Sequence, residues 1–106
     1  MDGVLVDSTP AVARVWSRWG SLHGFDPVWA TKIAHGRPSL FTLQELLPDA
    51  GREVHQREND WLEQAEIEDV KDVVALPGTV ELLSALPPGQ FAVVTSATRK
   101  LAEVRL

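Results

Sequence analysis

Two short apolar runs constrain the fold of this chain more than any other feature. One lies at the beginning, over residues 3–6, and the other lies near the end, over Phe91–Val94. Short runs rich in valine, joined by long helical connections, are typical of parallel strands that are buried on both faces. The sequence therefore predicts an α/β fold. Since two strands cannot bury a parallel sheet, we expect the chain to be part of a larger fold that continues at both ends.

The residues between the two runs have helical spacing. Ser8 and Pro10 favour a helix start, and apolar residues then recur every three or four positions as far as Leu22. Further helices are predicted over residues 26–33, 40–47, 53–68 and 79–86 and from Arg99 onward, with turns at 35–38 and 87–89. The residues just before 79 read as a loop that enters a helix.

Two groups of side chains in the helical stretch have a structural interpretation. The tryptophans fit a hydrophobic core better than a stacking platform, because two of them lie on one apolar helical stripe: Trp16, Trp19, Trp29 and Trp61. The carboxylates near the 53–68 helix fit a solvated face better than a metal cluster: Glu58, Asp60, Glu63, Glu66, Glu68 and Asp69.

The composition of the chain argues against several classes of function. The 106 residues carry a net charge of -5, and the lysines and arginines are scattered, so no nucleic-acid footprint is expected. The chain has no cysteine, which excludes disulfides and thiol nucleophiles. No apolar run approaches the roughly 18 residues of a membrane span, and no targeting segment is visible. We therefore expect a cytoplasmic protein with no membrane partner.

Three stretches carry a resemblance to a known family. They read MDGVLVDS at the start, ALPGTVELLSAL before the second apolar run, and FAVVTSATRKLAE from that run onward. In this order, with a helical insert between them, they resemble the first and second motifs of the haloacid dehalogenase superfamily. The stretch HGRPS, together with VVALPG and VTSATRKLAE, is similar to the branch of sugar and polyol phosphatases.

The resemblance implies a domain arrangement. Residues 1–11 and 75–106 would form part of a Rossmann-like core with a parallel sheet, and residues 12–74 would form the inserted α-helical cap. It also implies a Mg²⁺-dependent hydrolase that removes phosphate from a small phosphorylated sugar or polyol through an aspartyl-phosphate intermediate.

The resemblance assigns catalytic roles at the first motif. In this superfamily a first aspartate attacks phosphorus, and a second, two residues later, protonates the leaving oxygen and then activates water. Asp2 matches the second aspartate, and its backbone carbonyl matches a Mg²⁺ ligand. The first aspartate would stand immediately before Met1, and the lysine of the third motif would follow Leu106. We therefore expect the 106 residues alone to be inactive.

The second motif and the cap supply the remaining candidates. Thr95 matches the hydroxyl that binds the phosphoryl oxygens, and Ser96 stands beside it at the entrance of the last helix. Both hydroxyls could also cap that helix. His35 and Arg37 lie in a turn that either faces the active site, where the arginine could clamp substrate oxygens, or belongs to the surface.

Two other functions fit the same residues. A phosphosugar mutase resembling β-phosphoglucomutase would return the phosphoryl group to a different hydroxyl instead of to water. A non-catalytic fragment would act only by binding through exposed apolar surface.

Overall fold

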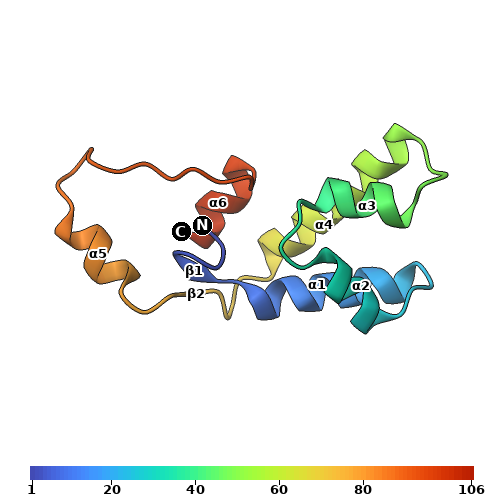
Figure 1. Cartoon of the computed structure of the whole chain (residues 1–106), viewed down its shortest axis with the longest axis horizontal. Helices are drawn as coiled ribbons and strands as arrows, with labels where there is room; N and C mark the ends of the chain where they lie inside the picture. Colours follow the sequence, from blue (N-terminus) through green and yellow to red (C-terminus); the bar gives the residue numbers. More distant parts are fainter.

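The computed structural model describes residues 1–106 and is mainly helical (Figure 1). Its elements, in chain order, are β1 Val6–Asp7, α1 Thr9–Leu22, α2 Pro27–Ala34, α3 Ser39–Leu46, α4 Arg52–Glu68, β2 Val74–Ala75, α5 Thr79–Ala85 and α6 Arg99–Arg105. The predicted helices are confirmed, each within a few residues of its expected bounds. No helix is long and apolar enough to span a membrane.

Helices α1 to α4 pack into one unit with its own hydrophobic core. The core joins all four helices through Val15, Trp16, Trp19, Ala34, Leu43, Leu46, Leu62 and Ala65. Trp19 is fully buried, and its ring lies edge-on to that of Trp16, with centroids 5.4 Å apart. Trp61 is partly buried and packs against this core. The core prediction is wrong only for Trp29, which is 45% exposed.

The sheet differs from the predicted one. β1 pairs with β2 in antiparallel register, Val6 opposite Ala75 and Asp7 opposite Val74. The segment around β2 was expected to be a loop, yet the backbone N–H of Leu76 donates to the carbonyl of Leu5 at 2.9 Å. The segment that leaves the helical unit thus supplies hydrogen-bond partners for the backbone of the first strand.

The strand predicted over Phe91–Val94 is absent from the structure, and so is the predicted parallel sheet. Residues 91–95 form no regular element, and Val94 is 92% exposed. A strand of a parallel sheet needs neighbours on both sides to satisfy its backbone groups, and no other strand lies beside this segment. Residue type indicated a buried strand, but tertiary neighbours decide whether one forms.

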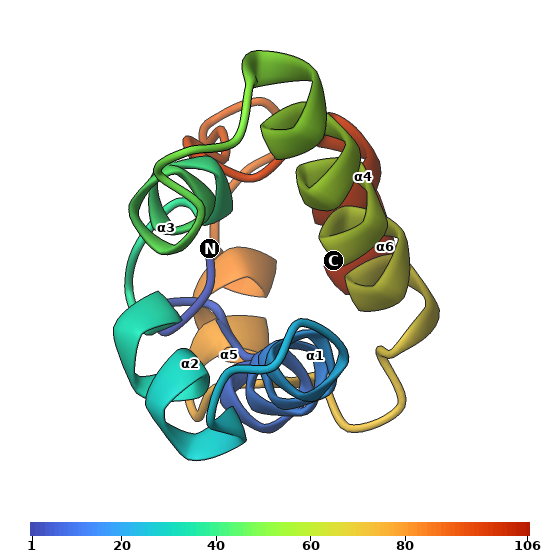
Figure 2. The same ribbon diagram turned by 90° about the vertical axis from the view of Figure 1, so that its right-hand side faces the viewer.

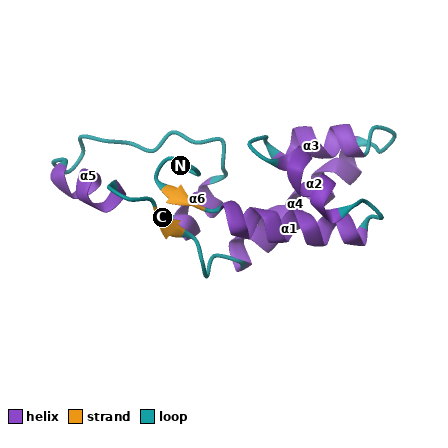
Figure 3. Ribbon diagram, turned by 60° about the horizontal axis from the view of Figure 1, so that its bottom comes forward, coloured by secondary structure: helices purple, strands orange, loops and turns teal.

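The molecule is elongated. Its principal extents are 49 × 25 × 20 Å, and its radius of gyration is 15.3 Å, whereas about 13 Å is typical of a compact domain of this length. Figures 1 and 3 show why: α5 and the long connection after it form an arm that extends away from α1–α4. Thr79 is the one buried residue of α5.

Helix α6 returns from this arm to the rest of the molecule. It lies along α4, as Figure 2 shows, and in its last turn Arg105 hydrogen-bonds to Asp2 of the N-terminal segment. Leu101 and Arg105 are its buried residues. This docking brings the two ends of the chain and the end of α4 together, and a cavity lies at their junction.

Candidate functional site

The cavity at this junction, here called the Thr95 cavity, has a volume of about 460 Å³. Its walls come from the N-terminus, α1, the turn between α2 and α3, α4, the end of the arm, and α6. Four of the five predicted site residues line it: Asp2, Arg37, Thr95 and Ser96. Segments that are far apart in sequence therefore meet at one cavity of the size typical for small ligands.

Asp2 is held by two hydrogen bonds on a single oxygen. Ser8 Oγ donates to Asp2 Oδ1 at 2.8 Å, and Arg105 Nη1 donates to the same oxygen at 2.8 Å. Neither bond involves Oδ2. Ser8 is the N-cap residue of α1, but its side chain makes no capping bond because it points to Asp2 instead.

Two charged residues of this cavity were not predicted as site residues. Arg105 has a side chain only 3% exposed, and its Nη2 also lies 3.5 Å from Glu66 Oε2. Burial raises the pKa of Glu66, while the positive charge of Arg105 opposes that rise. Glu66 was expected on a solvated face, and that prediction is wrong because α6 covers this end of α4.

Glu58, in the first half of α4, was also expected on the solvated face, and that prediction is wrong too. Its side chain is 14% exposed and accepts a hydrogen bond from Trp19 Nε1 at 3.1 Å. His23 Nε2 lies 3.1 Å from the same oxygen, and the ring of His23 stacks on Trp19. A carboxylate thus satisfies the polar atom of a buried indole.

Arg37 reaches the Thr95 cavity from the turn after α2. Its Nη1 forms an ion pair with Glu45 Oε2 of α3 at 2.5 Å, and both side chains are partly exposed. The pair leaves the guanidinium at the cavity wall with a partner that is accessible to solvent. An anionic ligand would compete with Glu45 for this charge.

The hydroxyl groups of Thr95 and Ser96 do not cap α6. Thr98 is its N-cap residue, and Thr98 Oγ1 accepts from the backbone N–H of Leu101 at 3.3 Å. Thr95 Oγ1 instead accepts from the N–H of Ala97 at 3.2 Å. The capping interpretation of Thr95 and Ser96 is therefore wrong, while both residues do line the cavity.

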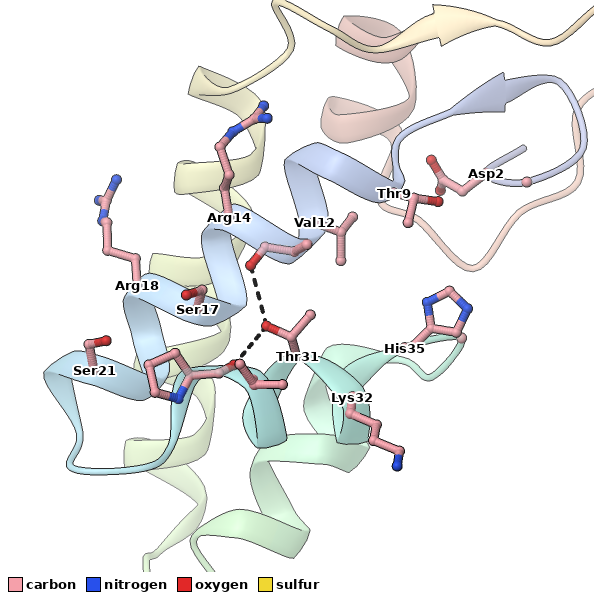
Figure 4. Close-up of a pocket in the computed structure, with 15 residues that line it drawn as sticks. Asp2, Thr9, Val12, Arg14, Ser17, Arg18, Ser21, Thr31, Lys32 and His35 are labelled. Atoms are coloured by element: carbon pink, nitrogen blue, oxygen red, sulfur yellow. Dashed lines mark hydrogen bonds between the residues drawn. The ribbon is translucent and has the colours of Figure 1, made fainter.

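His35 lies in a different hollow. A larger groove of about 1130 Å³ runs between α1 and α2, and His35 and Asp2 stand at one end of it with Ser21 at the other (Figure 4). Thr31 lines the middle of this groove and donates to the carbonyl of Pro27 at 2.8 Å. Asp2, Val12 and Gly36 line both the groove and the Thr95 cavity. The structure therefore places His35 near Asp2 but not beside Thr95.

The residues of this chain do not by themselves fit a magnesium site. No group of three or more aspartate, glutamate or histidine side chains is arranged to hold a metal ion. Asp2 would contribute one backbone carbonyl, whereas Mg²⁺ requires near-octahedral oxygen coordination.

Comparison with known proteins gives related sequences along almost the whole chain. Hexitol phosphatase A of Escherichia coli (strain K12) is 35% identical over 99% of this chain. This chain is related to the sugar and polyol phosphatases of the haloacid dehalogenase type. The family resemblance of its motifs is thereby confirmed.

Two yeast relatives support the same relationship. Glycerol-1-phosphate phosphohydrolase 2 of Saccharomyces cerevisiae is 29% identical over 97% of this chain, and 2-deoxyglucose-6-phosphate phosphatase 2 of the same yeast is 29% identical over 96%. The chain spans about half the length of hexitol phosphatase A (50%) and 42% and 46% of the two yeast proteins. No family model and no solved structure matches the chain.

Proposed function

We propose that this chain carries the substrate-binding half of a phosphatase that acts on small phosphorylated sugars or polyols. The observation that supports this most is the meeting of Asp2, Arg37 and Thr95 at one cavity, although they lie far apart in sequence. Its volume of about 460 Å³ suits a molecule of sugar-phosphate size. The printed names of the relatives point to hexitol, glycerol and deoxyglucose phosphates as the first substrates to test.

Asp2 has the acid and base role in this proposal. In the first step an aspartate outside these 106 residues attacks phosphorus, the bond between phosphorus and the sugar oxygen breaks, and Asp2 gives its proton to that oxygen. In the second step the Asp2 carboxylate takes a proton from water, whose oxygen attacks the aspartyl phosphate. Inorganic phosphate leaves, and both aspartates return to their starting forms.

Thr95, Ser96 and Arg37 bind the phosphoryl group and the sugar oxygens in this proposal. The Thr95 hydroxyl can donate to a phosphoryl oxygen, and the Arg37 guanidinium supplies positive charge at the same wall. His35 would contact the substrate from the end of the α1–α2 groove nearest Asp2. Residues 12–74 act as the cap and residues 1–11 and 75–106 as part of the core.

Mg²⁺ is the cofactor that the family resemblance predicts, and further ligands outside these 106 residues would be needed. With no metal donor set assembled in this chain, we expect it to bind substrate without hydrolysing it. No step above depends on the metal. The location of the protein in the cytoplasm also stays a prediction.

Binding can be tested on the 106-residue chain by NMR with inorganic phosphate, glycerol 1-phosphate and a hexitol phosphate. We expect the amide signals of Thr95, Ser96 and Arg37 to shift together, and those of α5 to stay in place. Shifts confined to other residues, or no saturable shift with any ligand, would contradict the proposed site.

Catalysis can be tested in a chimaera in which this chain replaces the matching half of hexitol phosphatase A. Thr95→Val keeps the side-chain shape but removes the hydroxyl, so turnover of a hexitol phosphate should fall on the order of tenfold to a thousandfold. Thr98→Val is the matched control, because Thr98 caps α6 instead of lining the cavity. Equal turnover in the chimaera with and without the Thr95 hydroxyl would remove Thr95 from the mechanism.

A further inference from the structure

We propose that Arg105 is the positioning residue for Asp2, and that it fixes which oxygen of Asp2 is free to exchange a proton. This inference rests on the proposed function of Asp2, but the contacts of Arg105 are present whether or not that function is correct. Arg105 lies in the last turn of α6, 103 positions from Asp2, and its Nη1 donates to Asp2 Oδ1 at 2.8 Å.

The environment of Arg105 makes this bond strong. The side chain is 3% exposed, so water screens its charge much less than it would on the surface. Its location in the last turn of α6 is also favourable, because the C-terminal end of a helix attracts positive charge. Glu66 Oε2, 3.5 Å from Nη2, supplies a second counter-charge from α4. The guanidinium is therefore held from two sides.

The bond from Arg105 matters because of which Asp2 oxygen it occupies. Ser8 and Arg105 both donate to Oδ1, so the carboxylate is fixed in one rotation and Oδ2 carries neither bond. Oδ2 is then the oxygen available to take a proton from water. Since general base catalysis depends on where the accepting oxygen stands, Arg105 would contribute without touching the substrate.

One further atom favours a functional role over a purely structural one. Arg105 Nε is buried and makes no hydrogen bond within the chain, although Arg105 lines the Thr95 cavity. Leaving a buried donor unpaired costs stability, and natural proteins leave few such groups. An arginine placed only for stability would have no reason to keep that cost.

The test uses NMR on the full 106-residue chain. In the parent chain we expect the Arg105 Hε proton to exchange with water at least about tenfold more slowly than that of Arg99, whose side chain is 90% exposed on the same helix. Asp2→Asn removes the charge and keeps the shape, and it should shift the Arg105 Nη signals. Equal exchange at the two arginines would overturn the proposal.

Substitutions of the arginine complete the test. Arg105→Gln should shift the side-chain carbon signal of Asp2, Arg105→Lys should restore part of that shift because it keeps the charge, and Arg99→Gln should leave it unchanged. If Arg105→Gln loosens α6, circular dichroism will show it and Arg105→Lys still decides. An Asp2 signal that is the same in Arg105→Lys, in a folded Arg105→Gln and in the parent would overturn the proposal. Failure of the parent to bind phosphate at Thr95 would instead count against the proposed function alone.

Discussion

At the scale of single residues, Glu45 competes with any anionic ligand of the Thr95 cavity for the charge of Arg37. Its pair with Glu45 is partly exposed, with 40% and 56% of the two side chains accessible, so it adds little to stability. Glu45→Gln should therefore leave the melting temperature almost unchanged while freeing Arg37 for an anion. We expect inorganic phosphate to bind about two- to fivefold more tightly, measured by NMR titration.

Net charge must be separated from this local effect. Glu81→Gln makes the same change in charge on α5, far from the cavity, and should leave phosphate binding as it is in the parent chain. Arg37→Gln should weaken binding in both the parent and the Glu45→Gln background. Equal tightening by Glu81→Gln and Glu45→Gln would show that the effect comes from overall charge and not from Arg37.

The candidate site was predictable only where a residue belongs to a local motif. Asp2 and Thr95 stand at the ends of recognisable apolar runs, and Arg37 stands in a turn marked by glycine and proline. Arg105 and Glu66 carry no such signal, because a charged residue on an amphipathic helix is usually solvated. Their burial depends on how α6 docks on α4, which no local pattern reports.

At the scale of elements, Arg14 ties the entrance of the helical unit to its exit. From α1 it donates to both carboxylate oxygens of Asp69 at 2.9 and 2.7 Å, and to both of Asp72 at 2.8 and 2.7 Å. These aspartates lie in the segment between α4 and β2. Paired, planar contacts of this kind are stronger than single surface ion pairs.

This clamp gives a pH-dependent contribution to stability. Hydrogen bonds from Arg14 lower the pKa of Asp69 and of Asp72 below the ordinary value of 3.8. The contribution is therefore complete above that value, and it is lost as pH falls through the lowered values. Arg14→Gln should lower the urea midpoint at pH 7, and its difference from the parent chain should shrink toward about pH 2.

A control variant separates the clamp from general loss of positive charge. The side chain of Arg57 is 73% exposed, and its ion pair with Glu58 is 3.8 Å long, so Arg57→Gln should change the midpoint little at either pH. A deficit of Arg14→Gln that is equally large at pH 7 and in acid would show that Arg14 acts through packing instead of through the two aspartates.

Helices were more predictable than strands in this chain for a physical reason. A helix satisfies its own backbone within a few residues, so spacing, caps and prolines fix α1 to α4 locally. A strand depends on neighbours that sequence alone does not name. Residues 91–94 have strand-forming composition but no partner, whereas β2 was missed because its partner, β1, lies far away in the sequence, at Val6–Asp7.

At the scale of the whole molecule, stability is concentrated in α1–α4. Leu43 of α3 is fully buried in the core of that unit, so Leu43→Ala should cost about 2 to 5 kcal/mol. Leu82 of α5 is 58% exposed, and Leu82→Ala should change the free energy of unfolding by less than about 1 kcal/mol. Urea denaturation followed by tryptophan fluorescence measures both. Comparable losses would place α5 inside a shared core, contrary to its exposure.

The same asymmetry should appear in the protection of backbone amides. Amides of α1 and α4 are hydrogen-bonded around buried tryptophans and leucines, so they should exchange only when the unit opens. Within residues 87–97 the one hydrogen bond between backbone groups runs from the N–H of Gln90 to the carbonyl of Pro87, and Phe91 and Val94 are exposed. Their amides should therefore exchange about as fast as in a mobile loop. Exchange measured by NMR on the monomeric chain decides between the two. Strong protection of residues 91–94, together with one sharp melt, would mean that this segment gains a strand partner in solution and that the arm belongs to the cooperative fold.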